Sequence, residues 1–170
     1  LPYRRLAERV KPERQRRKPN GEYALRKPLP ERWWQYGEKR PALRKAISGL
    51  SEVLVIALVS KTVMPFRVPR HQVFSHKLGV FASDSLVDQG VLSSTIHQLW
   101  VVKYSSTMRS DINYSPSDVF ETFPRPQATL DIQTATRSLD QERREIMVRR
   151  NLGLTKLYNM VNNSLLNSRD

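Results

Sequence analysis

Apolar residues along the chain gather in short blocks after residue 32, and their period changes from one block to the next. After Pro41, a good first residue for a helix, apolar residues recur at helical spacing over residues 42–50. The longest apolar run, Val53 to Val59, is rich in β-branched residues and has the length of a buried strand. The pattern predicts a short helix that leads directly into a buried strand.

Three shorter apolar stretches follow this run. Met64 to Pro69 carries two prolines, which confine it to a sheet edge or to a strand and turn. Val73 to Phe74 and Leu78 to Ala82 are bounded by polar residues and have the length of short strands. We therefore expect several short strands around the central one.

Helical periodicity returns between Asp84 and Tyr104. Asp84 suits the N-cap position, and Gly90 marks the expected break between two helices. The polar stretch Ser105 to Asn113 predicts a loop, and residues 114–123 predict a short strand, a capped turn of helix and an extended exit.

Beyond Leu130 the pattern predicts two amphipathic helices. Apolar residues recur at helical spacing from Ile132 to Met147, and we expect the mixed charges of residues 140–145 to face outward. Gly153 suits the C′ position that ends this helix, and Thr155 suits the start of the next one. The two would form a helical hairpin that needs a partner surface.

These elements indicate an α+β fold, with a small twisted mixed sheet, packed helices, a basic extended N-terminal arm and a C-terminal helical hairpin. We expect three parts: the arm over residues 1–32, a central domain over residues 33–127 and a helical segment over residues 128–170. Because the sequence begins with Leu1 and not with Met, we expect a fragment of a longer protein.

Charge is distributed unevenly along the chain. The net charge is +13, and residues 1–50 hold 15 Lys and Arg against five Asp and Glu, which places +10 there. Such a bias predicts a polyanionic partner, most simply nucleic acid, although a solvated tail would have the same composition.

Five prolines in residues 1–32 predict an extended arm with at most one helical turn near Leu6. The candidate phosphate contacts are Arg14, Arg16, Arg17, Lys18, Lys61 and Lys103.

Composition excludes several classes of protein. The chain has no Cys, which excludes disulfides and thiolate metal sites and fits a reducing cytoplasm, the location that we expect. No apolar run approaches the roughly 20 residues of a membrane span, so no membrane partner is expected. His71, His76 and His97 lack the spacing of a zinc-binding helix, and no metal site is predicted.

Catalytic motifs are missing from the sequence. The six glycines are scattered and never form Gly-x-Gly, and no Asn-Pro-Pro or Asp-Pro-Pro occurs to hold an extruded base. The Glu-x-Lys pair of metal-dependent nucleases is also missing. No catalytic residue is predicted, and whether the chain is part of an enzyme stays open on these grounds.

Four strings occur in a fixed order: WWQYGEKRP over Trp33–Pro41, VLSSTIHQLW over Val91–Trp100, YSPSDVFETFP over Tyr114–Pro124 and GLTKLYN over Gly153–Asn159. Together they resemble the target-recognition region of Type IIG-like restriction–modification enzymes, which are single-chain adenine-specific DNA methyltransferases, and of their phage-exclusion relatives. The resemblance runs from about Val10 to Asn163.

The resemblance implies a module that recognises a specific sequence in double-stranded DNA and performs no catalysis itself. In that family a methyltransferase domain, which uses S-adenosylmethionine, precedes the module and clamps the duplex from the opposite side. The methyltransferase domain would be this module's second partner, and the missing domain would bind the cofactor. The resemblance assigns a framework role to Trp33, Trp34, Arg40, Trp100, Phe120, Phe123 and Pro124.

The resemblance also assigns base reading to residues 60–76 and 103–113, between the framework strings. These segments hold side chains with suitable donors and acceptors: Arg suits guanine, Gln and Asn suit adenine, and Asp accepts from cytosine. The base-reading candidates are Arg67, Arg70, His71, Gln72, Arg109, Asp111, Asn113 and Tyr114. The large aromatic residues are expected to pack in the core and not to stack on bases.

Two other functions stay open. The basic arm also suits an RNA-binding or ribosome-associated protein, which would need exposed aromatic residues on a sheet or in a groove. The arm and the helical hairpin together also suit an assembly protein that binds a protein partner.

Overall fold

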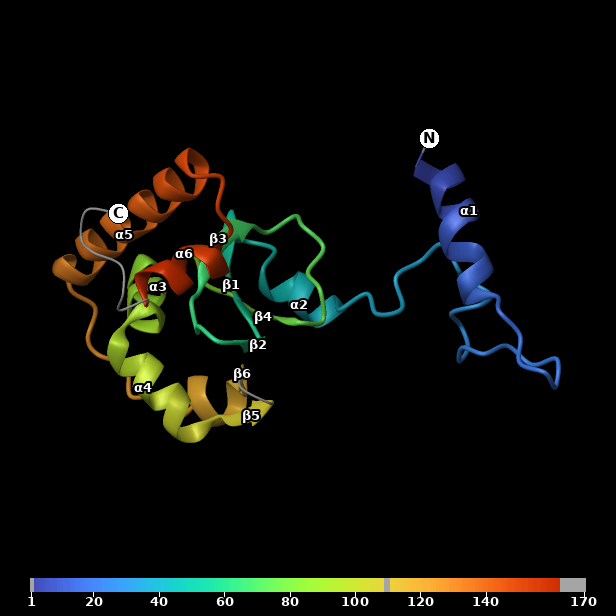
Figure 1. The fold of residues 1–170 in the computed structure, drawn as a ribbon, viewed down its shortest axis with the longest axis horizontal. Coiled ribbons are helices and arrows are strands. Elements are labelled where there is room, and N and C mark those ends of the chain that lie inside the picture. The colour runs from blue at the N-terminus through green and yellow to red at the C-terminus, as the bar shows by residue number, and fades with distance from the viewer. Residues whose placement is uncertain (1, 109–110, 163–170) are drawn as a thin grey trace. The chain divides into compact units, whose positions relative to one another are not determined.

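A computed structural model of the chain describes residues 2–108 and 111–162. Its contacts group the chain into two compact units, unit 1 (Leu1–Lys45) and unit 2 (Ala46–Asp170), which are considered separately below (Figure 1). The three parts expected from the sequence were defined by their roles, and the two compact units do not test those roles. The division into three parts therefore stays a prediction.

Unit 1 is built on helix α1 (Pro2–Arg14) and a long coil. We expected an extended arm here, and the helix differs from that expectation for three reasons. Pro2 occupies the first turn, where its missing N–H costs nothing. Arg4 pairs with Glu8 one turn later at 2.8 Å. The ring of Tyr3 lies 5.7 Å from that of Trp33, so a contact distant in sequence supports the helix.

The coil of unit 1 turns back on itself once and ends at helix α2 (Pro41–Ala46). An isolated bridge pairs Arg17 with Tyr23, and Gly21 takes a φ of 82° in the turn between them. Trp33 is buried. Helix α2 ends at Ala46, so the helix predicted over residues 42–50 is shorter than its apolar spacing indicated.

Unit 2 contains two antiparallel three-stranded sheets where we expected one mixed sheet. In the first, β1 (Glu52–Ala57) lies between β3 (Phe66–Pro69) and β4 (Leu78–Phe81). In the second, β6 (Asp111–Asn113) lies between β2 (Val59–Ser60) and β5 (Ser106–Met108). The short connection between β5 and β6 favours antiparallel pairing, because a parallel pair needs a long crossover.

The α+β class is confirmed, as are the buried central strand and the edge position of β3. Two expectations about strands were wrong. Residues 73–74 form no strand, and the stretch expected to be a loop before Tyr114 contains the β5–β6 hairpin. The hydrophobic pattern does not reveal this hairpin, because most of its residues are polar and only Ile112 of β6 packs against the core.

Helices α3 (Leu86–Ser93) and α4 (Thr95–Tyr104) follow the first sheet. The predicted pair of helices is present, but Ser85 and not Asp84 caps α3, and the break lies at Ser94, whose side chain caps α4. Gly90 lies inside α3 and marks no break. A Cβ atom there would lie 2.1 Å from Oγ1 of Thr136, so glycine allows α3 to approach helix α5 (Leu130–Arg149) closely.

The chain then forms η1 (Pro116–Phe120), one turn of π-helix, and the predicted pair α5 (Leu130–Arg149) and α6 (Leu154–Val161). Asn151 and not Gly153 takes the left-handed conformation after α5, with a φ of 50°. Arg143, expected to face outward, is buried and donates to the Pro65 carbonyl oxygen over 3.2 Å and to the Tyr158 hydroxyl. It therefore joins α5 to α6 and to the segment before β3.

The core of unit 2 lies between the sheets and the helices around them (Figure 1). Its buried cluster consists of Leu54, Ile56, Val63, Phe81, Leu92, Val101, Tyr114 and Val119. In the part of the chain that the structure describes, no helix is long and apolar enough to cross a membrane.

Candidate nucleic-acid interface

The hairpin formed by β5 and β6 presents two of the predicted base-reading residues on one face. Side chains alternate along a strand, so Asp111 and Asn113 point to one side of β6 and Ile112 points to the other. Ile112 packs against the core cluster of unit 2. Asp111 and Asn113 therefore lie on the face of this sheet that is turned away from the core.

Cross-strand pairing sets the neighbours of these two polar residues. Asn113 pairs with Ser106, and its amide Nδ2 donates to the Ser106 Oγ over 3.1 Å. Asp111 pairs with Met108 at the end of this ladder. Its Oδ1 atom is shielded from solvent and accepts no hydrogen bond from the described residues. Arg109, also a predicted base reader, lies outside the described residues.

Tyr114 fixes the end of β6 to the core. Its side chain is 3% exposed, and its backbone N–H donates to the Leu58 carbonyl oxygen over 2.7 Å. Its hydroxyl lies 3.4 Å from Nε2 of His97, and burial raises the pKa of Tyr114, which keeps that hydroxyl protonated. A base reader needs an exposed polar edge, and the structure gives Tyr114 none.

His97 is a residue of this region that the sequence did not single out. It is buried on α4, and its Nδ1 lies 2.9 Å from the Leu92 carbonyl oxygen, so Nδ1 carries the proton and Nε2 accepts from Tyr114. Burial lowers the pKa of His97 and favours this neutral form. Its spacing of four residues from the buried Val101 was the available signal that it faces the core.

Arg67, another predicted base reader, has its guanidinium engaged within the fold. Nε and Nη2 donate to Oε1 of the buried Gln89 over 3.3 and 3.1 Å, and Nη1 donates to the Asp84 carbonyl oxygen over 2.6 Å. Nε also lies 3.7 Å from Oε2 of Glu52, and the Arg67 side chain is only 11% exposed. Gln89 in turn donates to Asp140 on α5 over 2.8 Å. Arg67 thus joins β3 to two helices.

The remaining base-reading candidates of residues 60–76 follow β3 directly. Arg70, His71 and Gln72 are exposed in the connection from β3 to β4. The backbone N–H of Arg70 donates to the Ser51 carbonyl oxygen over 3.2 Å, which places this connection beside the start of β1.

The two predicted reading segments therefore lie at opposite ends of β1. The β3–β4 connection adjoins the residue before β1, whereas the β5–β6 hairpin is hydrogen-bonded to the residues just after it. β1 has six residues, and at about 3.3 Å per residue it is about 20 Å long. The structure does not bring the two sets of candidates together.

Two predicted phosphate contacts flank the hairpin in sequence. Lys61 is exposed in the turn after β2, whose residue Ser60 pairs with Ile112 of β6. Lys103 is exposed in the last turn of α4, just before β5, and its Nζ lies 5.2 Å from the Tyr104 ring centroid.

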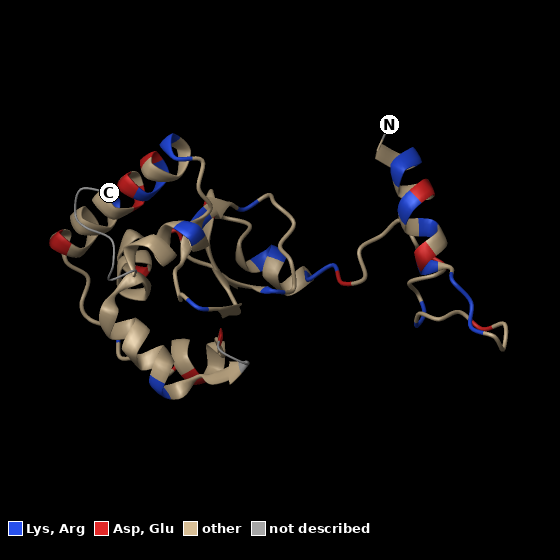
Figure 2. Cartoon of the chain, viewed as in Figure 1, with Lys and Arg blue, Asp and Glu red and all other residues tan. Residues whose placement is uncertain are grey.

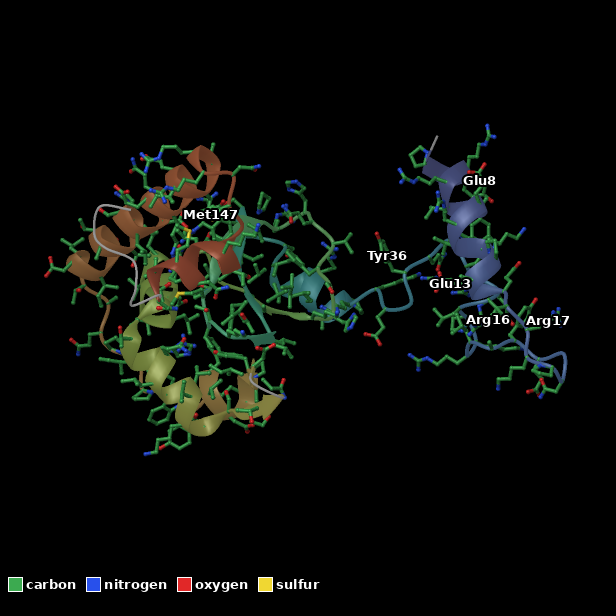
Figure 3. The ribbon with its side chains drawn as sticks, in the orientation of Figure 1. Glu8, Glu13, Arg16, Arg17, Tyr36 and Met147 are labelled. Carbon is green, nitrogen blue, oxygen red and sulfur yellow. The ribbon has the colours of Figure 1, made fainter. Side chains whose placement is uncertain are left out.

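The other four predicted phosphate contacts lie at and just beyond the C-terminal end of α1 (Figures 2 and 3). Arg16 and Lys18 are exposed. Arg17 donates to the Gly21 carbonyl oxygen over 2.7 Å and lies over the Tyr23 ring at 4.6 Å. Arg14 is half-buried and donates to the backbone of the later coil. Only part of this basic run is therefore available to a partner.

Most of the aromatic residues expected in the core pack there. Phe123 is buried against His97, with ring centroids 5.0 Å apart, and Phe120 packs at a tilt against Phe81, with ring centroids 4.5 Å apart. Trp100 donates from Nε1 to the Thr122 hydroxyl over 3.3 Å. Trp34 differs, because 49% of its side chain is exposed.

Arg40 and Pro124 are the two remaining framework candidates. Arg40 takes a φ of 46° in the residue before α2, a left-handed conformation uncommon for a residue with a side chain. Pro124 is exposed and lines an apolar groove of about 410 Å³ between α3, α4 and the exit segment. Within residues 2–108 and 111–162, no three His, Asp or Glu side chains gather closely enough to hold a metal ion.

Comparison with known proteins gives one match. A family model described as "MmeI, target recognition domain" matches residues 4–127 of the chain. This range covers nearly all of unit 1 and continues through both sheets, α3, α4 and η1 of unit 2. No curated protein and no solved structure matches the chain.

Proposed function

The chain belongs to the MmeI target recognition domain family, and we propose that its β5–β6 hairpin is the element that reads bases. Target recognition domains of this family are the DNA sequence-specificity modules of Type IIG restriction–modification enzymes, and this chain is such a module. DNA is therefore its partner.

One observation carries the proposal about the hairpin. Asp111 and Asn113 share the outward face of β6, while Ile112 and Tyr114 tie the same few residues to the core. Base reading needs polar groups held within a fraction of an ångström of a fixed position, and this requires support from packed residues behind them. An acidic side chain that accepts from cytosine, beside an amide that pairs with adenine, meets the chemical requirement.

The other candidates take different roles under this proposal. Arg67 and Tyr114 position the elements around them, because their polar groups are engaged inside the fold. Arg70, His71 and Gln72 form a second reading segment about 20 Å away, a distance that corresponds to about six base-pair steps. Lys61 and Lys103 contact the phosphates beside the hairpin.

The rest of the enzyme enters the proposal through the family. MmeI-family enzymes use S-adenosylmethionine, and the described part of this chain contains the recognition module alone. We place the cofactor and the methyl transfer to adenine in a methyltransferase domain that faces this module across the duplex. The expected location of the whole protein is the cytoplasm.

Selection of bound duplexes from a randomised DNA pool tests the proposal. Asp111→Ala and Asn113→Ala should each relax the preference at one position of the selected sequence, by about 1–3 kcal/mol. The dependence of affinity on salt should not change, because no phosphate contact is removed. Arg109→Ala tests the third base-reading candidate of residues 103–113, which lies outside the described residues, in the same way. Gln127→Ala, an exposed polar residue outside the hairpin, is the matched control.

Two outcomes would overturn the proposal. Unchanged sequence preference in all three variants, Asp111→Ala, Asn113→Ala and Arg109→Ala, would place the reading element elsewhere in the chain. Single-stranded RNA that competes better than DNA duplex for the wild-type chain would favour the RNA-binding alternative instead.

A further inference from the structure

Unit 1 contains a pocket of about 290 Å³ within residues 28–39, a segment to which the sequence assigned no ligand. Its polar lining comes from Arg32, Gln35, Tyr36 and Lys39, and Leu29 and Gly37 form part of its wall. Ligand pockets in proteins begin at about 300 Å³, so this volume suits a small fragment of a larger ligand.

Hydrogen bonds hold the walls of this pocket in place. The backbone N–H of Arg32 donates to the Pro28 carbonyl oxygen, and that of Gln35 donates to the Arg32 carbonyl oxygen, each over 2.9 Å. Arg14 at the end of α1 donates to the carbonyl oxygen of Gln35. A Cβ atom on Gly37 would lie 3.0 Å from Cδ2 of Leu29, which shows how closely the coil passes this wall.

The two cations at the pocket are available to a ligand. The Arg32 and Lys39 side chains are exposed, and neither makes a hydrogen bond or an ion pair with any residue in the ranges 2–108 and 111–162. The two nearby carboxylates have other partners. Glu31 pairs with Lys27 at 3.3 Å and Glu38 lies 3.9 Å from Arg26.

Tyr36 adds an aromatic surface beside these cations. Its side chain is 67% exposed and lies on the coil that leads to α2 (Figure 3). Most of this ring is open to a ligand, whereas Trp33 is the buried aromatic residue in the described part of unit 1. The combination suits a ligand with an anionic group next to a flat or weakly polar surface.

We propose that this pocket takes one nucleotide unit of the DNA backbone. Arg32 and Lys39 bind the phosphate, the ring of Tyr36 packs against the deoxyribose, and Gln35 supplies a neutral hydrogen-bonding group. The proposal rests on the function of the chain as a DNA-recognition module and adds a discrete backbone site to it. Such a site fixes the position of unit 1 along the duplex without reading bases.

Salt dependence of binding to a duplex of scrambled sequence tests the proposal with the full chain. Arg32→Ala/Lys39→Ala should make the slope of log K against log salt shallower by about 0.9, because the slope grows by about 0.9 for each phosphate neutralised and the two cations share one phosphate. Arg5→Ala/Arg9→Ala removes the same charge from exposed positions of α1 and should leave the slope nearly unchanged. An equal fall in both double variants would show diffuse attraction, and no fall in Arg32→Ala/Lys39→Ala would show no contact; either result overturns the proposal.

Substitution of Tyr36 tests the aromatic part of the site. Tyr36→Ala should weaken binding several-fold at every sequence, because it removes the apolar surface that packs against the deoxyribose. Tyr36→Phe should bind as the wild type does, because the ring and not the hydroxyl makes the contact. Equal affinity of Tyr36→Ala and the wild type would remove Tyr36 from the site.

Backbone amide NMR signals separate this inference from the proposed function of the hairpin. On addition of the duplex, signals of Arg32, Tyr36, Gly37 and Lys39 should shift together with those of the β5–β6 hairpin. Shifts in the hairpin alone would overturn the pocket and leave the hairpin proposal standing. Shifts in the pocket alone would support the backbone site and remove the hairpin from the interface.

Discussion

Units 1 and 2 of this recognition module differ in the way that charge and burial are distributed. Unit 1 holds 15 Lys and Arg against five Asp and Glu, whereas unit 2 holds 14 against 11. In the described part of unit 1 only Pro30 and Trp33 are buried, whereas unit 2 has a continuous apolar core. The basic charge thus lies in the unit with little core, and the predicted base readers lie in the unit with a packed one.

This difference fits the two physical tasks of DNA recognition. Attraction to phosphates is long-ranged and tolerates imprecise placement, so it needs charge more than rigidity. Base reading fails when a side chain moves by about an ångström, so it needs packed support. The distribution of residues suggests that affinity is built mainly into unit 1 and sequence preference mainly into unit 2.

The largest expected effect concerns the contrast in burial between the units. Ile56 of β1 is 1% exposed in the core cluster, and Ile56→Ala should lower the free energy of unfolding by about 2–5 kcal/mol. Leu6→Ala removes a side chain of the same size that is 38% exposed on α1 and should cost far less. Urea denaturation measures both values, and equal losses would contradict the contrast.

A second prediction separates support from reading within unit 2. Arg67→Ala leaves Oε1 of the buried Gln89 without its donor and should lower the free energy of unfolding by about 1–3 kcal/mol. Sequence preference of the folded fraction should not change, because the Arg67 guanidinium faces Gln89 and Asp84. A shift in the selected DNA sequence without a loss of stability would assign Arg67 to base reading instead.

The elements of unit 2 that have strong apolar periods were predictable from the sequence. The run after Ser51 became β1, and the two apolar stripes after Leu130 became α5 and α6. The β5–β6 hairpin was not predicted, because a short polar hairpin leaves no apolar period to detect. The helix α1 was missed because its prolines favoured an extended arm and because part of its support, the contact with Trp33, is one that sequence spacing does not report.

Prediction of the site residues was limited in the same way, because the sequence does not report contacts between distant residues. Residue chemistry was sufficient to place Asp111 and Asn113 among the candidates, and alternation along β6 explains why both face outward. Chemistry alone failed to distinguish an arginine that is exposed from one engaged by neighbours. The Arg67 guanidinium, for example, donates to the buried Gln89, which its residue type does not reveal. The pocket at Tyr36 was not predicted, since it depends on how the coil folds back on itself.

A third prediction concerns how the stability of unit 2 depends on pH. All three histidines of the chain lie in this unit. Burial lowers the pKa of His97 below its ordinary value of 6.5, so the folded state keeps it neutral while the unfolded state takes up a proton below that pH. The free energy of unfolding should therefore fall as the pH falls from 7.5 to about 5.5. Fluorescence-detected urea denaturation at several pH values measures the effect.

The His97→Gln variant is the control for this pH dependence. It keeps a hydrogen-bonding side chain on α4 and removes the titrating imidazole, so its stability should vary less with pH over the same range. His71→Gln, at an exposed position, should vary as the wild type does. Equal pH dependence in all three proteins would show that His97 titrates in the folded state as freely as in the unfolded one.

The smallest expected effect concerns the basic run of unit 1, where Arg16 and Arg17 differ in their partners. Arg17 is engaged by Gly21 and Tyr23, whereas the Arg16 side chain is exposed. Arg16→Ala should lower the slope of log K against log salt by about 0.9 and reduce affinity equally for all sequences, since it removes one phosphate contact. Arg16→Lys keeps the charge and should restore the slope. An effect of Arg16→Ala on the preferred DNA sequence would break the division between affinity in unit 1 and specificity in unit 2, because a phosphate carries no information about its base.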